Sequence, residues 1–124
     1  MNKTRHVVAI VDDDPRLLES VGDLLESAGY VAQSFSSAAS LLVNGLSGLD
    51  LLITDIGMPG MDGFELERVI QGRRPGLPVI LITGRHEIAE LPQARHNRFF
   101  RKPFDGQALL AAIGDALTGK ETPP

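Results

Sequence analysis

Acidic, hydroxyl and basic side chains occur at the points where short apolar runs of the sequence end. Asp12 and Asp13 follow the first run, and Asp55 follows the third. Thr83 closes the fourth run, and Lys102 ends the fifth. If these runs are parallel strands, their carboxyl ends meet at one edge of a sheet, which is where ligands bind in such folds. The pattern therefore predicts that three carboxylates, a hydroxyl and an ammonium group converge.

Such a group of side chains is suited to phosphoryl chemistry. Clustered carboxylates repel one another, so at neutral pH they need a cation or must take up protons. Hard oxygen ligands without a nearby imidazole or thiol favour Mg²⁺, with Mn²⁺ as an alternative. Lys102 supplies a positive charge for phosphate oxygens, and Thr83 supplies a hydrogen-bond donor. An aspartate beside a metal and a lysine can act as a nucleophile toward phosphorus.

Each of these residues, taken singly, also has an ordinary structural explanation. The aspartates before Pro15 could be helix caps, and Asp55 could belong to a turn. Thr83 and Lys102 could be plain strand ends. A functional site is favoured because these residues occur together, each at the matching end of a different predicted strand.

The segments that must position these residues alternate between strand and helix patterns five times. We predict strands over residues 6–11, 30–35, 49–54, 79–82 and 98–101, with amphipathic stretches after them. This alternation favours an α/β fold with a single parallel sheet, right-handed crossovers and helices on both faces. Asp14 and Pro15 are predicted to begin the first helix, Gly29 to end it, and Asp105 to cap the last.

The composition limits the other possibilities. The chain has 124 residues, enough for one domain, and it lacks cysteine, which excludes disulfides and Cys-ligated zinc. We expect a cytoplasmic protein, because there is neither an apolar run of about 20 residues nor a signal-peptide pattern. The net charge of −4 argues against direct binding of nucleic acid. We assign residues 1–119 to the domain and 120–124 to a tail or the start of a linker.

Nearly the whole chain resembles the receiver domain of two-component response regulators. The resemblance rests on motifs that occur in the family's order: Val11-Asp12-Asp13, Leu52-Ile53-Thr54-Asp55, Met58-Pro59, Asp62-Gly63, Val79-Ile80-Leu81-Ile82-Thr83-Gly84 and Lys102-Pro103-Phe104. It implies a doubly wound, flavodoxin-like sheet with strand order 2-1-3-4-5. It also implies that a sensor histidine kinase or phosphotransfer protein donates the phosphoryl group.

The resemblance assigns a role to each site residue. Asp55 would be the phospho-acceptor, and Lys102 would pair with the phosphoryl group. Asp12 and Asp13 would form an acidic pocket, in which Asp13, Asp55 and the backbone carbonyl of Gly57 hold Mg²⁺.

A switch and a backbone feature are implied as well. Thr83 would move toward the phosphorylated site, and Phe99 would change its packing in concert, with Phe100 as the competing aromatic for that role. The Lys102-Pro103 bond would be cis. The output would be a downstream protein or a fused domain missing from this chain, and a free-standing regulator and an excised domain both fit.

The segment between Thr83 and Lys102 departs from the family pattern. It is shorter than usual, and Pro92 falls inside residues 87–95, where the fourth helix is expected. Because proline breaks helices, we expect that helix to be shortened or irregular. The dimerisation mode common in the family, which uses this surface, is therefore in doubt here.

Three rival functions remain. A receiver that acts as an adaptor without phosphorylation is one. A small Mg²⁺-dependent aspartate phosphohydrolase is another, but Gly57 stands where such enzymes carry a second aspartate. A flavin or nucleotide binder would want a glycine-rich or hydroxyl-rich phosphate loop, whereas the first loop here is acidic. We expect no turnover enzyme, only catalysis of the domain's own phosphorylation and dephosphorylation.

Overall fold

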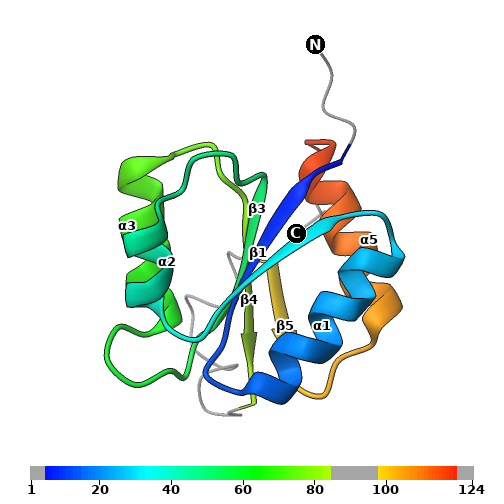
Figure 1. The fold of residues 1–124 in the computed structure, drawn as a ribbon, viewed down its shortest axis with the longest axis horizontal. Helices are drawn as coiled ribbons and strands as arrows, with labels where there is room; N and C mark the ends of the chain where they lie inside the picture. Colours follow the sequence, from blue (N-terminus) through cyan, green and yellow to red (C-terminus); the bar gives the residue numbers. More distant parts are fainter. Residues whose placement is uncertain (1–4, 85–97, 120–124) are drawn as a thin grey trace.

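A five-stranded parallel sheet forms the centre of the molecule (Figure 1). The computed structural model describes residues 5–84 and 98–119. The strands are β1 (Val7–Val11), β2 (Val31–Phe35), β3 (Leu51–Asp55), β4 (Val79–Thr83) and β5 (Arg98–Arg101). They lie in the order β2-β1-β3-β4-β5, and every neighbouring pair is parallel. The predicted topology is therefore confirmed.

Helices cover both faces of the sheet. In Figure 1, α2 and α3 lie on one side of the strands, whereas α1 and α5 lie on the other. Their bounds are α1 (Pro15–Ser27), α2 (Ala38–Asn44), α3 (Gly63–Arg73) and α5 (Gly106–Leu117). The irregular helix predicted within residues 87–95 lies outside the described residues. None of the described helices is long and apolar enough to cross a membrane.

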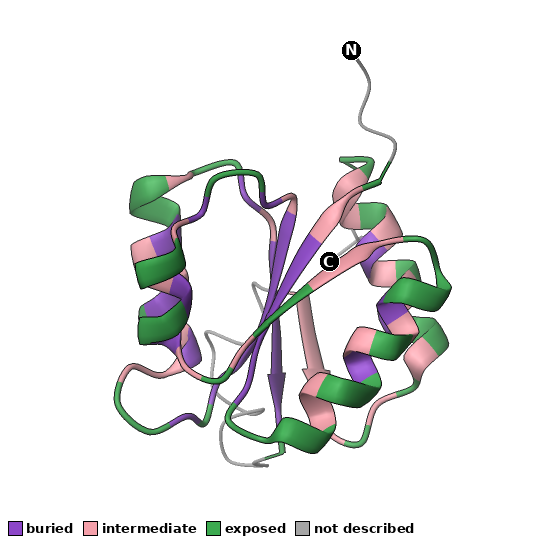
Figure 2. Ribbon diagram, viewed as in Figure 1, coloured by how far each residue is buried: buried purple, intermediate pink, exposed green. Residues whose placement is uncertain are grey.

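Successive residues of each strand pack into two separate cores, because side chains alternate between the faces of a sheet. Every residue of β3 and β4 is buried, as the continuous apolar runs predicted (Figure 2). The core beneath α2 and α3 takes its strand residues from one parity: Ala9, Val11, Leu52, Val79 and Leu81. The core beneath α1 and α5 takes the other parity: Val8, Ile10, Leu51, Ile53, Ile80 and Ile82.

Polar caps begin the helices immediately after the strands. Asp14 accepts a hydrogen bond from the backbone N of Arg16 at 2.9 Å, with Pro15 in the first turn, and Asp105 caps α5 in the same way. Gly29 follows α1 with a φ of 92°, a conformation that glycine adopts without strain. These predicted helix ends are confirmed.

The third strand starts later and ends later than the sequence predicted. Leu49 belongs to a turn, in which its backbone N donates to the carbonyl of Leu46 at 3.3 Å. The guanidinium of Arg74 holds this turn, since Nη1 donates to the carbonyls of Leu46 and Leu49 at 2.7 and 2.8 Å. At the other end, Asp55 pairs with Ile82 of β4 and is part of the strand.

Candidate functional site

Strand parity and register bring the predicted site residues to one corner of the sheet. Asp12 lies two residues beyond Ile10, and Asp55 two beyond Ile53, so both continue the parity of the α1/α5 face. The pairing of Val11 with Thr54 puts the next residues of these two strands, Asp12 and Asp55, side by side.

Lys102 joins these carboxylates from the far side of β4. Its Nζ donates to Asp12 Oδ2 at 2.9 Å and lies 3.7 Å from Asp55 Oδ1. Carboxylate oxygens of Asp12, Asp13 and Asp55 all lie within 4.8 Å of one another. Asp12 is fully buried and Asp55 nearly so, whereas Asp13 is exposed. The cluster thus has a buried floor and an open side.

The side chain of Lys102 passes Gly84, the residue that follows β4. The backbone N of Lys102 donates to the carbonyl of Thr83 at 2.7 Å, which fixes where the side chain starts. A Cβ added to Gly84 would meet the Lys102 side chain first, with Cδ at 3.8 Å and Cβ at 3.9 Å. Lys102 therefore lies beside the bare backbone of Gly84 on its way to the carboxylates. The predicted cis bond between Lys102 and Pro103 is present.

The two oxygens of Asp12 are both engaged within the protein. Oδ2 accepts from Lys102, and Oδ1 accepts from the backbone N of Asp14 at 2.8 Å. Asp55 Oδ1 accepts from the backbone N of Gly57 through a longer contact of 3.4 Å. Asp12 thus anchors Lys102 and the first loop, while Asp13 and Asp55 present carboxylates nearer to solvent.

The electrostatics of the cluster oppose ionisation of its central carboxylate. Burial raises the pKa of Asp55 most, and the charge of Asp12 adds to it, while Lys102 and the Gly57 amide act in the opposite direction. Burial acts to lower the pKa of Lys102, but the hydrogen bond to Asp12 and the charges of Asp55, Asp12 and Asp14 raise it overall. Lys102 is therefore a permanent cation facing an excess of negative charge.

Thr83 and Phe99 belong to the α2/α3 face of the sheet, whereas the strand parity of Asp12 and Asp55 is that of the α1/α5 face. Thr83 is fully buried and follows Leu81 in the α2/α3 parity, and Phe99 pairs with Leu81 and packs against the same core. Phe100 packs into the other core, where its ring lies 6.2 Å from that of Phe104 in an edge-to-face arrangement. Strand parity thus pairs Phe99, and not Phe100, with Thr83.

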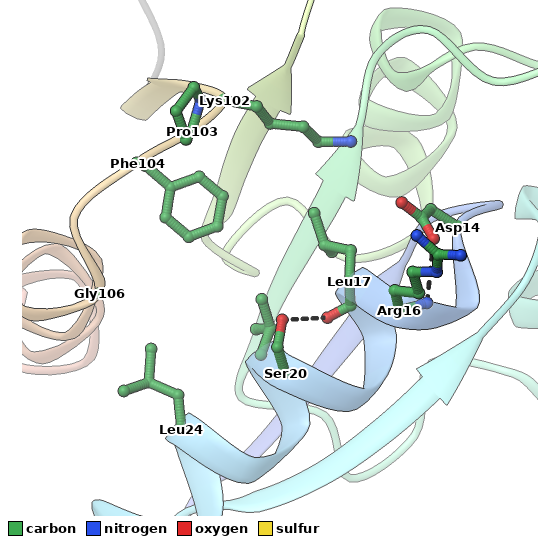
Figure 3. A pocket seen from close by; sticks show the side chains of 10 residues that line it. Asp14, Arg16, Leu17, Ser20, Leu24, Lys102, Pro103, Phe104 and Gly106 are labelled. Atoms are coloured by element: carbon green, nitrogen blue, oxygen red, sulfur yellow. Dashed lines mark hydrogen bonds between the residues drawn. The ribbon is translucent and has the colours of Figure 1, made fainter.

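An open groove adjoins the cluster between α1 and the segment that leads into α5 (Figure 3). Its volume is about 670 Å³, and its walls are largely apolar, with Leu17, Leu24 and Phe104 facing into it. Lys102 and Asp14 lie at the end nearest the carboxylates. The sequence did not predict this groove.

A second feature that the sequence did not predict is a contact behind Asp55. Asp62-Gly63 was noted only as part of a motif, but the Cα of Gly63 lies against the backbone of Asp55 and Ile56. The signal that the sequence offered for this contact was the position of Asp62-Gly63 directly before a predicted helix.

The fold and the cluster together define a doubly wound α/β protein with an acidic, lysine-containing site at the carboxyl edge of its sheet. The family model of the response regulator receiver domain matches residues 8–114. The chain therefore belongs to the receiver domain family of two-component response regulators, as its sequence motifs indicated.

Comparison with individual proteins agrees with this assignment. The chain is 41% identical over 120 residues to the transcriptional regulatory protein GlrR of Escherichia coli (strain K12), which covers 94% of the chain and 27% of that protein. It is 36% identical over 115 residues to the transcriptional regulatory protein FixJ of Azorhizobium caulinodans, and this match covers 89% of the chain and 54% of that protein. A response regulator receiver domain structure from Clostridium thermocellum superimposes with a TM-score of 0.82 at 27% identity. The superposition covers 92% of this chain and 95% of that structure's chain.

The chain spans between about a quarter and about half of the length of these curated relatives.

Proposed function

We propose that this receiver domain accepts a phosphoryl group on Asp55 from the phosphohistidine of a sensor kinase or phosphotransfer protein. The observation that carries the proposal is the position of Lys102 Nζ, 2.9 Å from Asp12 and 3.7 Å from Asp55. A fixed cation beside a nearly buried carboxylate can bind the oxygens of an incoming phosphoryl group. The domain itself then ranges over residues 1–119, with 120–124 as a tail or linker.

The donor set fits a Mg²⁺ ion. Three carboxylates can each offer an oxygen within 4.8 Å of the others, and no imidazole or thiol belongs to the cluster that the described residues form. Asp13, Asp55 and the backbone carbonyl of Gly57 would hold the ion, with Asp12 behind them. Mn²⁺ has the same ligand preference. When bound, the ion supplies positive charge that offsets the carboxylates and the phosphoryl oxygens.

The reaction is a displacement at phosphorus. A carboxylate oxygen of Asp55 attacks the phosphorus, and the new O–P bond forms as the N–P bond to the donor imidazole breaks. The imidazole leaves with the electron pair of that bond. Lys102 keeps its proton throughout and holds a phosphoryl oxygen, which orients the group for in-line attack. Water later hydrolyses the acyl phosphate, so the domain undergoes a cycle of its own modification and turns over no separate substrate.

The output follows from the charge that phosphorylation adds. A phosphoryl group brings nearly two negative charges and strong acceptor oxygens to the edge of the sheet. We propose that the Thr83 hydroxyl donates to it and that Phe99, on the same face, repacks. Since the relatives are longer than this chain, the switch would act on a fused output domain or a separate partner.

The groove beside the cluster suits the protein that delivers the phosphoryl group. A donor histidine must reach Asp55 from outside, and the groove leads from the surface to Lys102. Its apolar walls at Leu17, Leu24 and Phe104 suit the apolar face of a donor helix, and Arg16 adds a positive charge at the same end as Lys102.

The test is the intact mass of the protein after incubation with acetyl phosphate. We expect one adduct of about 80 Da that requires both Mg²⁺ and Asp55, and that is absent from Asp55→Asn. An adduct that persists in Asp55→Asn would move the site elsewhere. No adduct in the native protein, together with no binding of beryllofluoride, would favour an adaptor that works without phosphate. Steady hydrolysis of a chromogenic phosphomonoester would instead indicate a phosphohydrolase.

A further inference from the structure

The first turn of α3 lies directly against the backbone that carries the acceptor. Gly63 is the first residue of this helix, and its backbone N donates to the carbonyl of Ile56 at 3.0 Å. A Cβ built on Gly63 would lie 2.6 Å from the carbonyl oxygen of Asp55 and 2.7 Å from the Cα of Ile56. Glycine is therefore required for this approach.

Both partners in this contact are held from behind. On the helix side, Asp62 and Glu65 form a reciprocal capping box, with hydrogen bonds of 2.9 and 3.1 Å, and Leu66 is fully buried. On the sheet side, the backbone N of Ile56 donates to the carbonyl of Ile82 at 2.8 Å. A helix end and a strand end, each fixed by its own bonds, thus meet at Gly63.

A methyl group at this position would move the acceptor loop. The contact of 2.6 Å is about 0.8 Å shorter than the 3.4 Å at which ordinary contacts begin. The atoms it meets are backbone atoms, so no side-chain rotation can relieve the overlap. The end of β3 at Asp55 and the loop after it that carries Gly57 would shift by a large part of this distance, and a misplacement of about 1 Å in an active site can lower the rate roughly a hundredfold.

We propose that Gly63 is a positioning residue: it lets the capped end of α3 close against Asp55 and Ile56, and this contact sets where the Asp55 carboxylate and the Gly57 carbonyl stand. The inference rests on the proposed function of Asp55. It adds a residue that touches neither metal nor phosphoryl group and acts through the backbone between them.

The test compares Gly63→Ala with Gly72→Ala in the same helix. A Cβ on Gly72 meets nothing within 4 Å, so this control gains helix propensity without any clash. Mg²⁺ affinity is measured by calorimetry and the phosphorylation rate with acetyl phosphate by intact mass, on protein shown to be folded by circular dichroism. We expect Gly63→Ala to lose at least tenfold in both quantities and Gly72→Ala to match the native protein. Native values in folded Gly63→Ala would overturn the proposal.

A second variant keeps the test decisive if Gly63→Ala does not fold, even in sucrose. Asp62→Ala removes the cap without adding a side chain near Asp55, and we expect Mg²⁺ affinity to fall at least threefold. Unchanged affinity in that variant would refute the proposal as well. The two levels of inference fail separately. If the native protein gives no adduct, the proposed function fails, while the Mg²⁺ affinities still decide the role of Gly63.

Discussion

Replacing Asp55, the proposed phospho-acceptor, by asparagine is expected to make the metal-free protein more stable. The substitution keeps the size and shape of the side chain and removes one negative charge from a cluster of three carboxylates and one lysine. Burial and the charge of Asp12 are the two largest causes that raise the pKa of Asp55. Ionising this carboxylate therefore costs more free energy in the folded state than in the unfolded chain.

The size of the effect follows from distances in the cluster. At an effective dielectric constant of about 20, charges on Asp12 and Asp55 within 4.8 Å repel by at least about 3.5 kcal/mol. Lys102 at 3.7 Å from Asp55 attracts it by about 4.5 kcal/mol on the same scale. These two terms nearly cancel, so the desolvation of Asp55 and the further repulsion from Asp13 decide the sign. We expect Asp55→Asn to gain about 1–2 kcal/mol, within the range of about 0.5–2 kcal/mol that a stabilising substitution commonly gives.

The gain depends on pH in a defined direction. Below the ordinary aspartate value of about 4, Asp55 is protonated in both states and its charge costs nothing. As the pH rises above that value, the unfolded chain loses this proton while the folded protein retains it, so the native protein loses stability until the raised folded pKa is passed. Asp55→Asn escapes this loss. Its advantage should thus be absent at low pH and complete once the pH exceeds the raised pKa of Asp55 in the folded protein.

Urea unfolding followed by circular dichroism measures this difference, because the chain has no tryptophan and one tyrosine. In EDTA at neutral pH, the melting temperature should rise by about 4 °C per kcal/mol in a chain of 124 residues. Mg²⁺ should shrink the difference, because it stabilises the native cluster and the variant has lost a ligand. The reasoning would be refuted if Asp55→Asn were no more stable than the native protein in EDTA. It would also be refuted if the difference in stability between the two proteins were the same at every pH.

Three further substitutions test other parts of the structure. Lys102→Met leaves the buried Asp12 without its cation, so we expect a loss of about 2–3 kcal/mol in urea unfolding without metal, and phosphorylation by acetyl phosphate should fall at least tenfold; native behaviour in both would contradict this. Arg74→Met removes two bonds to backbone carbonyls and should cost about 2 kcal/mol in the same assay, yet a changed phosphorylation rate would argue against its purely structural role. Ser20→Arg narrows the groove from an exposed position and should slow phosphoryl transfer from a histidine-phosphorylated kinase, measured with a radiolabelled phosphoryl group. The rate of phosphorylation by acetyl phosphate should not change. Equal slowing with both donors would show that the groove is not the donor's path.

The sequence predicted the fold and the convergence of the site because both depend on period and parity. Continuous apolar runs such as those of β3 and β4 indicate strands covered on both faces, and the structure buries each residue of them. Once the strands are parallel, alternation alone carries Asp12 and Asp55 to the same face. The same rule separates Phe99 from Phe100.

Contacts between segments that lie far apart in the sequence could not be predicted in this way. No local pattern shows that Arg74 at the end of α3 holds the turn before β3, and the strand begins after this turn, at residue 51 and not at the predicted residue 49. Likewise, the motif Asp62-Gly63 indicates a turn and a helix cap, but the approach of Gly63 to Asp55 depends on how α3 packs against the end of β3. The predicted fourth helix within residues 87–95 stays a prediction.

Lys102 offsets part of the excess negative charge of the site. Lys102 neutralises the fully buried Asp12 at 2.9 Å and lies further from the acceptor, 3.7 Å from Asp55. The carboxylate that cannot reach solvent is therefore paired within the protein, and Asp55, the proposed phospho-acceptor, is left less completely compensated. Burial and the charge of Asp12 raise the pKa of Asp55, so a bound cation would stabilise its ionised carboxylate. The cost of ionising Asp55 and the reactivity proposed for it thus have the same electrostatic origin.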